Sequence, residues 1–595
     1  MNLHNTLDLA LLLQIPRVEA GFDISPDGTR VAFSWNKTGH WEIYELEFLP
    51  RKHGDRGEKK ITGGEGAKFS PRYLPNGNKL AYALDLDGSE SYHIVLHDLQ
   101  TNSNTDLTPG SAYAQQPNFA FSPDEKNVAI LCDEPGQFAL YLLSIETGMK
   151  KMLLDLHRPI WDVRWSPDGQ WIAVEAEMEA SDRGVFIVNI ESGKWVQLKS
   201  NERSLNAEQP AWSPDSRFIV FAGESGEWFD IGLYEIETGK IEWLSHGAGD
   251  DTSPCWSVDG RRISWVHAEG AANSLMVWER GAPIERYQLS AGVHSHPQFT
   301  PKGEILLLFE SPRQTPDLWK LTLGGSFEQL TFSMPDEVRE AVFALPEEIV
   351  YDNDGVSVPA LLYRGHGNFA VVEIHGGPNW HVQFSWDPVS AHMASRGWTI
   401  LLPNYRGSTG YGRAWQIASR YDMGGVDTRD CAKGVDLLLS EGLANRFAVT
   451  GRSHGGYLTM TCLTQFPELW CGGSAVVPFM NWFKSHEDSR EDLQHWNIEN
   501  MGDPKENYER WYNASPYFFL DRVRAPVQLI CGGNDPRCPA SDSLDARDKL
   551  VALGKDVQLL LYEEEGHAFL KIANVIDSEI RRVEFLAAIL GNVNT

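Results

Sequence analysis

The chain has 595 residues, enough for two to four domains. Its composition, 42% hydrophobic and 23% charged, is normal for a globular protein with a sizeable core. The formal net charge of −30 argues against nucleic acid and anionic membrane surfaces as partners. Two interpretations of the charge remain open: solubility, or a negative field that attracts cationic substrates such as free amino termini.

Seven cysteines are scattered along the chain without a C-x-x-C pair, as expected of reduced thiols in a cytoplasmic protein. Residues 1–21 have no basic region, and Asp8 interrupts their apolar stretch. We expect an N-terminal helix there and not a signal peptide. No run of 18 apolar residues occurs, so we expect no membrane-spanning segment.

The first half of the chain repeats one phrase seven times. "DISPDGTRVAFSW" begins at residue 23 and "RWSPDGQWIAVEA" at residue 164, and equivalent turn positions recur every 43 to 49 residues. Proline presets φ, Asp and Gly tolerate the tight corner, and the apolar run that follows is typical of a strand. The equivalent turn residues are Pro26, Pro75, Pro123, Pro167, Pro214, Val258 and Pro301.

A repeat of this length with about four strands is typical of a β-propeller blade. We therefore predict a seven-bladed propeller over residues 22–335. A WD-repeat interaction propeller is the alternative, but the paired G-H and W-D signatures are missing.

After about residue 345 the pattern changes to alternating strands and helices. "EEIVYD" and "VPALLYR" predict an opening hairpin, and runs such as "FAVVEIHGG" and "APVQLICGGND" are typical of buried parallel strands. We predict an α/β-hydrolase domain with a doubly wound, mostly parallel sheet over residues 336–595.

The segment "TGRSHGGYLT" places Ser453 in a G-x-S-x-G spacing between a strand and a helix. This is the context of a nucleophile elbow, where flanking glycines relieve crowding around an exposed hydroxyl. Such a hydrolase needs an acid and a histidine in the order Ser, Asp, His. Asp535 and His567 follow two later strands in that order, and both are predicted at carboxyl ends of strands, where α/β sites assemble.

The predicted mechanism also needs an oxyanion hole. "EIHGGPNW" follows the third strand, so the backbone N–H of Gly376 or Gly377 is expected to act with that of His454. No metal constellation and no phosphate loop is apparent in the sequence, and we expect neither a metal nor a cofactor.

With these motifs, the chain resembles the prolyl oligopeptidase family of serine peptidases, most closely its acylaminoacyl peptidase branch. The resemblance extends over almost the whole chain, through "HGGP" at 375, "NYRGSTGYG" at 404, "GRSHGGY" at 451, "GGNDPRCP" at 532 and "EEGHAF" at 564. It implies that residues 1–21 pack on the hydrolase domain. From the two-domain architecture we also expect that the propeller covers the active site and admits only short, flexible chains.

The resemblance assigns the triad to Ser453, Asp535 and His567. It implies that Arg537 holds a substrate carbonyl and that Phe479 and Trp482 wall the S1 pocket. A structural ion pair for Arg537 and a core role for the two aromatics are the alternatives.

Three features depart from the family pattern. His375 stands where some members have a tyrosine that serves the oxyanion hole, and Cys538 stands where a valine is common. The glutamate pair that binds a free amine in dipeptide-releasing members cannot be placed: "DEPG" at 133 and "EMEASD" at 177 are candidates no better than solvated loops.

The sequence predicts a serine oligopeptidase that acts through an acyl-enzyme on short peptides and releases N-terminal acylamino acids, amino acids or dipeptides. An esterase or small-amide hydrolase with the same triad is the alternative, and a non-catalytic propeller scaffold is a third class. The P1 preference, exo- or endo-cleavage and the oligomeric state, homo-oligomer included, stay open.

Overall fold

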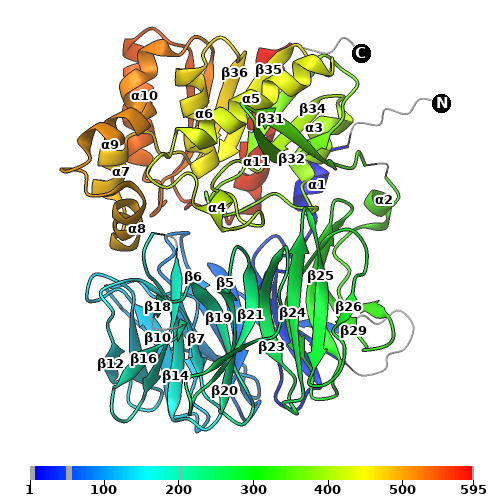
Figure 1. The fold of residues 1–595 in the computed structure, drawn as a ribbon, viewed down its shortest axis with the longest axis vertical. Helices are drawn as coiled ribbons and strands as arrows, with labels where there is room; N and C mark the ends of the chain where they lie inside the picture. Colours follow the sequence, from blue (N-terminus) through cyan, green and yellow to red (C-terminus); the bar gives the residue numbers. More distant parts are fainter. Residues whose placement is uncertain (1–6, 49–56, 181, 201–202, 342, 592–595) are drawn as a thin grey trace. The chain divides into compact units, whose positions relative to one another are not determined.

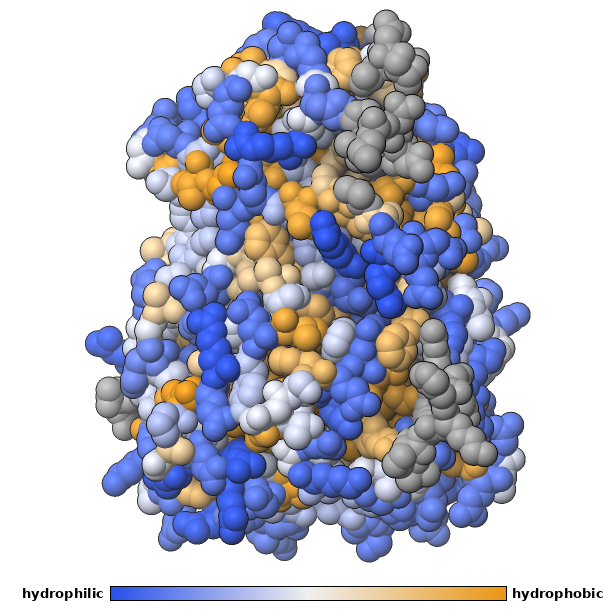
Figure 2. All heavy atoms as spheres, turned by 90° about the vertical axis from the view of Figure 1, so that its right-hand side faces the viewer, coloured by the Kyte–Doolittle hydropathy of each residue, from blue (hydrophilic) through white to orange (hydrophobic). Residues whose placement is uncertain are grey.

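The computed structural model describes residues 7–48, 57–180, 182–200, 203–341 and 343–591. Contacts divide the chain into two compact units: residues 16–86 and 90–334 form one, and residues 1–15, 87–89 and 335–595 form the other. Hydrophilic residues predominate on the face shown in Figure 2, interrupted by small hydrophobic patches. In the described ranges, no helix combines the length and the apolar character needed to cross a membrane.

The first unit is a β-propeller of seven four-stranded antiparallel sheets, each built from consecutive strands (Figure 1). Blades one to three comprise β1 (Asp23–Ile24), β2 (Arg30–Trp35), β3 (Glu42–Glu47) and β4 (Glu58–Lys60); β5 (Ala67–Tyr73), β6 (Lys79–Asp85), β7 (His93–Asp98) and β8 (Ser103–Asp106); and β9 (Ala120–Phe121), β10 (Asn127–Cys132), β11 (Ala139–Ser144) and β12 (Lys150–Leu154). Blades four and five comprise β13 (Ile160–Trp165), β14 (Trp171–Glu177), β15 (Arg183–Asn189) and β16 (Trp195–Gln197); and β19 (Ala207–Trp212), β20 (Phe218–Glu224), β21 (Phe229–Glu235) and β22 (Ile241–Trp243). Blades six and seven comprise β23 (Asp250–Trp256), β24 (Arg262–Glu269), β25 (Ala272–Glu279) and β26 (Glu285–Tyr287); and β27 (Val293–Phe299), β28 (Ile305–Ser311), β29 (Gln314–Leu321) and β30 (Phe327–Gln329).

Between the fourth and fifth blades in the sequence, β17 (Lys199–Ser200) and β18 (Arg203–Ser204) pair as a two-stranded antiparallel sheet. The seven-bladed architecture predicted from the repeat is confirmed.

The serine–proline–aspartate turns form the same hydrogen bonds in blade after blade. In the first blade, Ser25 Oγ donates to Asp27 Oδ1 at 2.6 Å and accepts from the backbone N–H of Arg30 at 2.9 Å. Gly28 adopts φ 65°, a conformation that glycine takes at little cost. The motif thus fixes each turn through its own side chains. Equivalent Ser–Asp pairs are Ser122–Asp124, Ser166–Asp168, Ser213–Asp215 and Ser257–Asp259.

Among the described strands, none is shared between the first and the seventh blade, so side chains and a short segment close the ring. Val31 and Phe33 of β2 pack with Leu306 and Leu308 of β28 in one buried cluster. The segment that precedes β1 adds backbone bonds, since the N–H of Val18 donates to the carbonyl of Pro316 at 3.0 Å. Burial of apolar side chains is the main stabilising contribution at this closure.

The second unit contains an eight-stranded sheet in the order β31-β32-β34-β33-β35-β36-β37-β38. The predicted opening hairpin is present as β31 and β32, and the strands from β34 onward run parallel. The fold is an α/β hydrolase. The strands are β31 (Glu347–Asn353), β32 (Val356–Tyr363), β33 (Phe369–Ile374), β34 (Thr399–Pro403), β35 (Arg446–Arg452), β36 (Gly472–Val476), β37 (Val527–Gly532) and β38 (Val557–Tyr562).

Helices form two groups against this sheet (Figure 1). One group, α3 (Pro388–Ser395) and α11 (Ile572–Leu590), contacts α1 (Leu9–Gln14) as well as the strands. The other includes α5 (Val426–Ser440), α6 (His454–Gln465) and α10 (Ala540–Ala552), with the 3₁₀ segment η1 (Pro516–Arg522) against α6 and α10. The remaining helices are α2 (Asp336–Arg339), α4 (Arg413–Gln416), α7 (Trp482–Asp488), α8 (Glu491–Met501) and α9 (Tyr508–Ala514).

The helix near the N-terminus is short and packs within the second unit. Asp8 caps it by accepting from the N–H of Leu11 at 3.0 Å, and Leu9 and Leu12 are buried. The carbonyl of Leu7 is 2.6 Å from Nδ1 of His392 in α3. The helix expected within residues 1–21 spans Leu9–Gln14, while residues 1–6 of that range lie outside the described residues.

Candidate active site

Ser453 lies in the sharp turn between β35 and α6, with φ 59° and ψ −122°. Such a conformation costs free energy for a residue with a side chain, so the surroundings must hold it in place. The N–H of Ser453 donates to the carbonyl of Val476 at 2.9 Å. A Cβ at Gly451 would lie 2.5 Å from the carbonyl oxygen of Gly455, and one at Gly455 would lie 2.0 Å from that of Ile374. Only glycine fits on either side of this serine.

Three side chains from three strand ends meet in a hydrogen-bonded chain. Nε2 of His567, which follows β38, lies 3.0 Å from Ser453 Oγ, and its Nδ1 lies 2.8 Å from Asp535 Oδ2. Asp535 follows β37, and its Oδ1 accepts from the backbone N–H groups of Arg537 and Cys538 at 2.8 and 2.9 Å. The carboxylate thus holds the imidazole in the tautomer that can accept a proton from the serine.

The expected oxyanion-hole residues adjoin this serine. A Cβ at Gly376 would lie 3.4 Å from that of Ser453, while Gly377 has φ 127° and lines a cavity together with Ser453 and His454. Within the described ranges, the N–H groups of Gly377 and His454 have no hydrogen-bond acceptor. His454 also begins α6, whose N-terminus favours developing negative charge.

His375 has a supporting position in the same turn. Its Nδ1 lies 2.7 Å from the carbonyl of Gly376, its Nε2 lies 2.9 Å from Ser408 Oγ, and its ring stacks on Tyr405 at 4.3 Å. Burial lowers the pKa of His375 to about 3, which keeps the ring neutral. Both ring nitrogens are therefore engaged away from the serine, which leaves backbone N–H groups as the candidate donors beside Ser453.

A cavity of about 170 Å³ opens beside Ser453. Phe479, Leu493, Trp496 and Cys538 supply its apolar wall, and Ser485, Ser489 and Asn497 supply uncharged polar groups. Arg537 also lines the cavity, with an exposed side chain.

Trp482 does not line the cavity, which corrects the sequence expectation. It is 1% exposed and packs edge-on against Phe479, with ring centroids 4.9 Å apart. Trp482 is the first residue of α7. Its side chain lies in the hydrophobic core, where Phe479 packs against it.

Sequence reasoning missed the residues that α7 and α8 contribute to the cavity. Leu493, Trp496 and Asn497 recur at the i, i+3, i+4 spacing that places side chains on one helical face. Ser485 and Ser489 are likewise four residues apart. The spacing was a usable signal for one shared face, but it could not show that this face meets Ser453.

The loop that carries Phe479 is held by a buried carboxylate. Asp542 Oδ2 accepts from the N–H groups of Met480 and Asn481, at 2.5 and 3.0 Å. Burial raises the pKa of Asp542 to about 6, against the lowering effect of these two bonds. Phe479 is thereby positioned from both sides, by Trp482 and by Asp542.

Cys538 forms part of the wall next to the serine, and burial raises the pKa of its thiol well above the usual value. One donor atom each of Asp535, Cys538 and His567 lie within 4.8 Å of one another. In this group, Nδ1 of His567 and Oδ2 of Asp535 are only 2.8 Å apart. Two ligand atoms of a tetrahedral zinc ion, with bonds of about 2.0–2.2 Å, lie farther apart than this. The group therefore fits a hydrogen-bonded triad with an adjoining thiol better than a metal centre.

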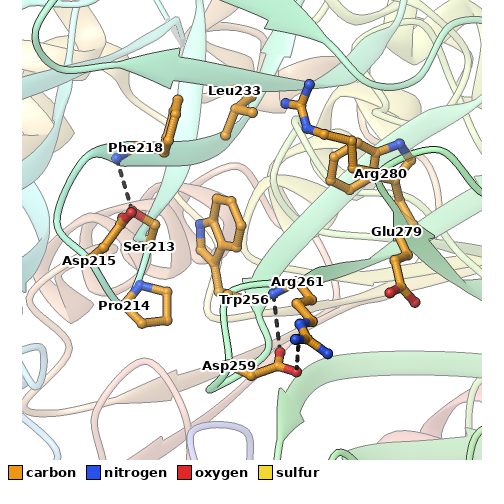
Figure 3. Close-up of a pocket in the computed structure, with 12 residues that line it drawn as sticks. Ser213, Pro214, Asp215, Phe218, Leu233, Trp256, Asp259, Arg261, Glu279 and Arg280 are labelled. Carbon is orange, nitrogen blue, oxygen red and sulfur yellow. Dashed lines mark hydrogen bonds and ion pairs between the residues drawn. The ribbon is translucent and has the colours of Figure 1, made fainter.

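A larger pocket, about 630 Å³, lies in the propeller between the fifth and sixth blades (Figure 3). Its three acidic residues already have partners: Asp215 and Asp259 bind the backbone of their blade turns, and Glu279 pairs with Arg262 at 2.9 Å. The side chains of Trp256 and Phe218 both line the pocket. The described residues that line it include no serine–histidine pair, so the smaller cavity beside Ser453 is the better candidate for chemistry.

The fold and the Ser–His–Asp chain together define a serine hydrolase with an attached propeller. Residues 382–593 match the Prolyl oligopeptidase family, and residues 89–345 match the TolB beta propeller domain. The uncharacterized peptidase YuxL of Bacillus subtilis is 24% identical, with 84% of this chain and 93% of that protein aligned. The acylamino-acid-releasing enzyme of Rattus norvegicus is 31% identical, with 64% of this chain and 50% of that protein aligned.

Among solved structures, a puromycin-hydrolyzing peptidase of Mycobacterium tuberculosis superposes with a TM-score of 0.83 at 20% identity, covering 98% of this chain and 96% of that one. This likeness supports the fold. The match over residues 382–593 places the hydrolase domain in the Prolyl oligopeptidase family and identifies the chain as a serine peptidase.

Proposed function

We propose that this protein is a cytoplasmic oligopeptidase that cleaves short peptides through an acyl-enzyme on Ser453. The observation that carries the proposal is the hydrogen-bonded chain from Asp535 through His567 to Ser453 Oγ, with distances of 2.8 and 3.0 Å. These three hydrogen-bonded side chains lie at the carboxyl ends of parallel strands, where α/β enzymes assemble their sites.

In the proposed reaction, Ser453 Oγ attacks the substrate carbonyl carbon while Nε2 of His567 takes its proton. Negative charge develops on the carbonyl oxygen, where the N–H groups of His454 and of Gly377 or Gly376 stabilise it. His567 then donates the proton to the leaving amine, and the C–N bond breaks. Water, activated by the same histidine, hydrolyses the acyl-enzyme and regenerates the serine.

We further propose that the enzyme releases N-terminal residues as acylamino acids, amino acids or dipeptides. The sequence similarity to an acylamino-acid-releasing enzyme supports the first of these products. Arg537, at the edge of the triad loop, is proposed to bind a substrate carbonyl on the acyl side.

The test compares chromogenic anilides of a single amino acid, once with a free and once with an N-acetylated amine, and with Ser453→Ala as the control. Faster release from the acetylated compound supports an acylaminoacyl peptidase. Faster release from the free amine supports an aminopeptidase. Hydrolysis that persists at the original rate in Ser453→Ala would refute the assignment of the nucleophile.

A further inference from the structure

The cavity beside Ser453 has an apolar wall and an uncharged polar interior. Phe479, Leu493 and Trp496 are half-buried, whereas Ser485 and Asn497 are only 5% and 7% exposed. Three of the four apolar wall residues are thus more exposed than the two polar residues, whereas Cys538, the fourth, is 7% exposed. The cavity is large enough for one side chain of a substrate.

Two polar side chains of the lining have no hydrogen-bond partner in the part of the chain that the structure describes. Among the described residues, neither the hydroxyl of Ser485 nor the carboxamide of Asn497 forms a hydrogen bond. Ser489, which lines the same cavity, differs because its hydroxyl donates to the carbonyl of Ser485. Neither group is enclosed in the protein as a buried unpaired atom, so both are open to the cavity, where a bound ligand can form hydrogen bonds with them.

The charge of the cavity narrows the class of ligand. Arg537 is its one charged lining residue in the described ranges, and its side chain is exposed. A charged substrate group placed in the interior would lose its hydration without an opposite charge beside Ser485 and Asn497. An uncharged group that donates and accepts hydrogen bonds suits a hydroxyl and a carboxamide better.

We propose that this cavity binds the side chain on the acyl side of the cleaved bond and selects one with an aromatic body and an uncharged hydroxyl end, tyrosine above all. The ring would pack against Phe479 and Trp496, and the phenol would hydrogen bond to Ser485 and Asn497. Phenylalanine would fill the same space but leave both polar groups unpaired, and that penalty is the source of discrimination. The inference rests on the proposed function and deepens it.

The first test measures kcat/KM for a series of anilides of tyrosine, phenylalanine, leucine and lysine, with the N-terminal group that the enzyme accepts. We expect tyrosine to exceed phenylalanine about tenfold, the size of one or two neutral hydrogen bonds, and lysine to be the poorest. Phenylalanine equal to or better than tyrosine would overturn the inference while leaving the proposed peptidase intact.

Variants connect the preference to the two residues. Asn497→Leu keeps the size of the side chain but removes its hydrogen bonds, so the tyrosine-to-phenylalanine ratio should fall toward one while phenylalanine turnover is retained. Ser485→Ala should lower the ratio severalfold. Retained phenylalanine turnover also shows that the variant is folded. A ratio that stays at the wild-type value in both variants would contradict the assignment.

Asn500→Leu is the matched control. Asn500 is a buried asparagine of the same helix whose Nδ2 donates to the carbonyl of Trp496 at 2.9 Å, and it does not line the cavity. Its substitution should leave the tyrosine-to-phenylalanine ratio unchanged.

Binding provides a readout that does not depend on turnover. Ser453→Ala protein is titrated with N-acetyl-tyrosine and N-acetyl-phenylalanine, and we expect severalfold tighter binding of the tyrosine compound. Equal affinities would overturn the inference, whatever the outcome of the kinetics. Conversely, selective binding by a protein that hydrolyses none of the anilides would refute the proposed function and leave the pocket assignment standing.

Discussion

The propeller and the hydrolase unit use serine and aspartate in opposite ways. In the blade turns, a serine hydroxyl donates to an aspartate two residues later and accepts a backbone N–H three residues after that, so both groups are satisfied locally. In the hydrolase unit, Ser453 Oγ faces a histidine 114 residues away in the chain. The backbone conformation decides which role serine takes: a relaxed turn makes it structural, and a strained elbow leaves it available for chemistry.

The largest difference between the two kinds of serine should appear in activity. Ser453→Ala is expected to lower kcat by about 1,000-fold or more, because the nucleophile is lost while the fold keeps its packing. Steady-state hydrolysis of an anilide and a thermal melt measure the two effects. A parallel loss of activity and folded protein would show instead that Ser453 is needed for the fold.

Substitution by alanine should destabilise the protein far more at the glycines of the nucleophile elbow than at glycines with free space around the Cβ position. Gly455→Ala would place a Cβ 2.0 Å from the carbonyl oxygen of Ile374, so we expect it to lower the free energy of unfolding by about 3 kcal/mol or more and to displace Ser453. Gly63→Ala in the propeller is the control, since no atom lies within 4 Å of its Cβ. Denaturant titration of both variants checks the prediction, and equal stabilities would contradict it.

A buried aspartate should make propeller stability depend on pH. Asp317 is fully buried, and burial raises its pKa to about 7 from an ordinary value of 3.8, against the lowering effect of bonds from Thr331 and Ser333. The folded state therefore binds this proton more tightly than the unfolded state. Its contribution to stability is complete below about pH 4 and is lost as the pH rises through 7.

Asp317→Asn should remove this part of the pH dependence. Wild-type protein is expected to lose on the order of 1–3 kcal/mol more than the variant between pH 5 and pH 8. Denaturant titrations of the propeller transition at the two pH values measure the difference. Parallel curves for the two proteins would mean that Asp317 stays ionised in the folded state.

The smallest effect is expected at a single blade turn. Ser257→Ala removes the bonds to Asp259 Oδ1 and from the N–H of Arg262, at 2.7 and 2.8 Å, in one of several equivalent turns. We expect a loss of about 1 kcal/mol in stability and no change in kcat. A thermal melt and an anilide assay check both, and a fall in kcat would show that the turn influences the site.

The propeller repeat and the strand–turn–helix pattern could be predicted from the sequence because each depends on residues close together in the chain. The seven turns, the opening hairpin and the G-x-S-x-G elbow each depend on residues a few positions apart, whose φ preferences and side-chain bonds are set by neighbours. The order Ser453, Asp535, His567 was readable as well, because carboxyl ends of parallel strands converge.

The cavity could not be predicted in the same way. Trp482 was expected in its wall and lies in the core, whereas Trp496 and Asn497 line it without any motif. Which of two neighbouring aromatics faces a cavity depends on how α7 and α8 pack against the loop after β36. A difference of one helical position turns a side chain by about 100°.

The sequence alone thus determined the two domain types and the candidate nucleophile, acid and base, since turn chemistry and strand periodicity act over short distances. Tertiary packing decided what lies beside the nucleophile: an apolar wall, two unpaired polar groups and a thiol, gathered from segments as far apart as Gly377 and Cys538. Specificity depends on such long-range contacts because a cavity is bounded by whichever faces the packed helices present, and no local pattern records that choice.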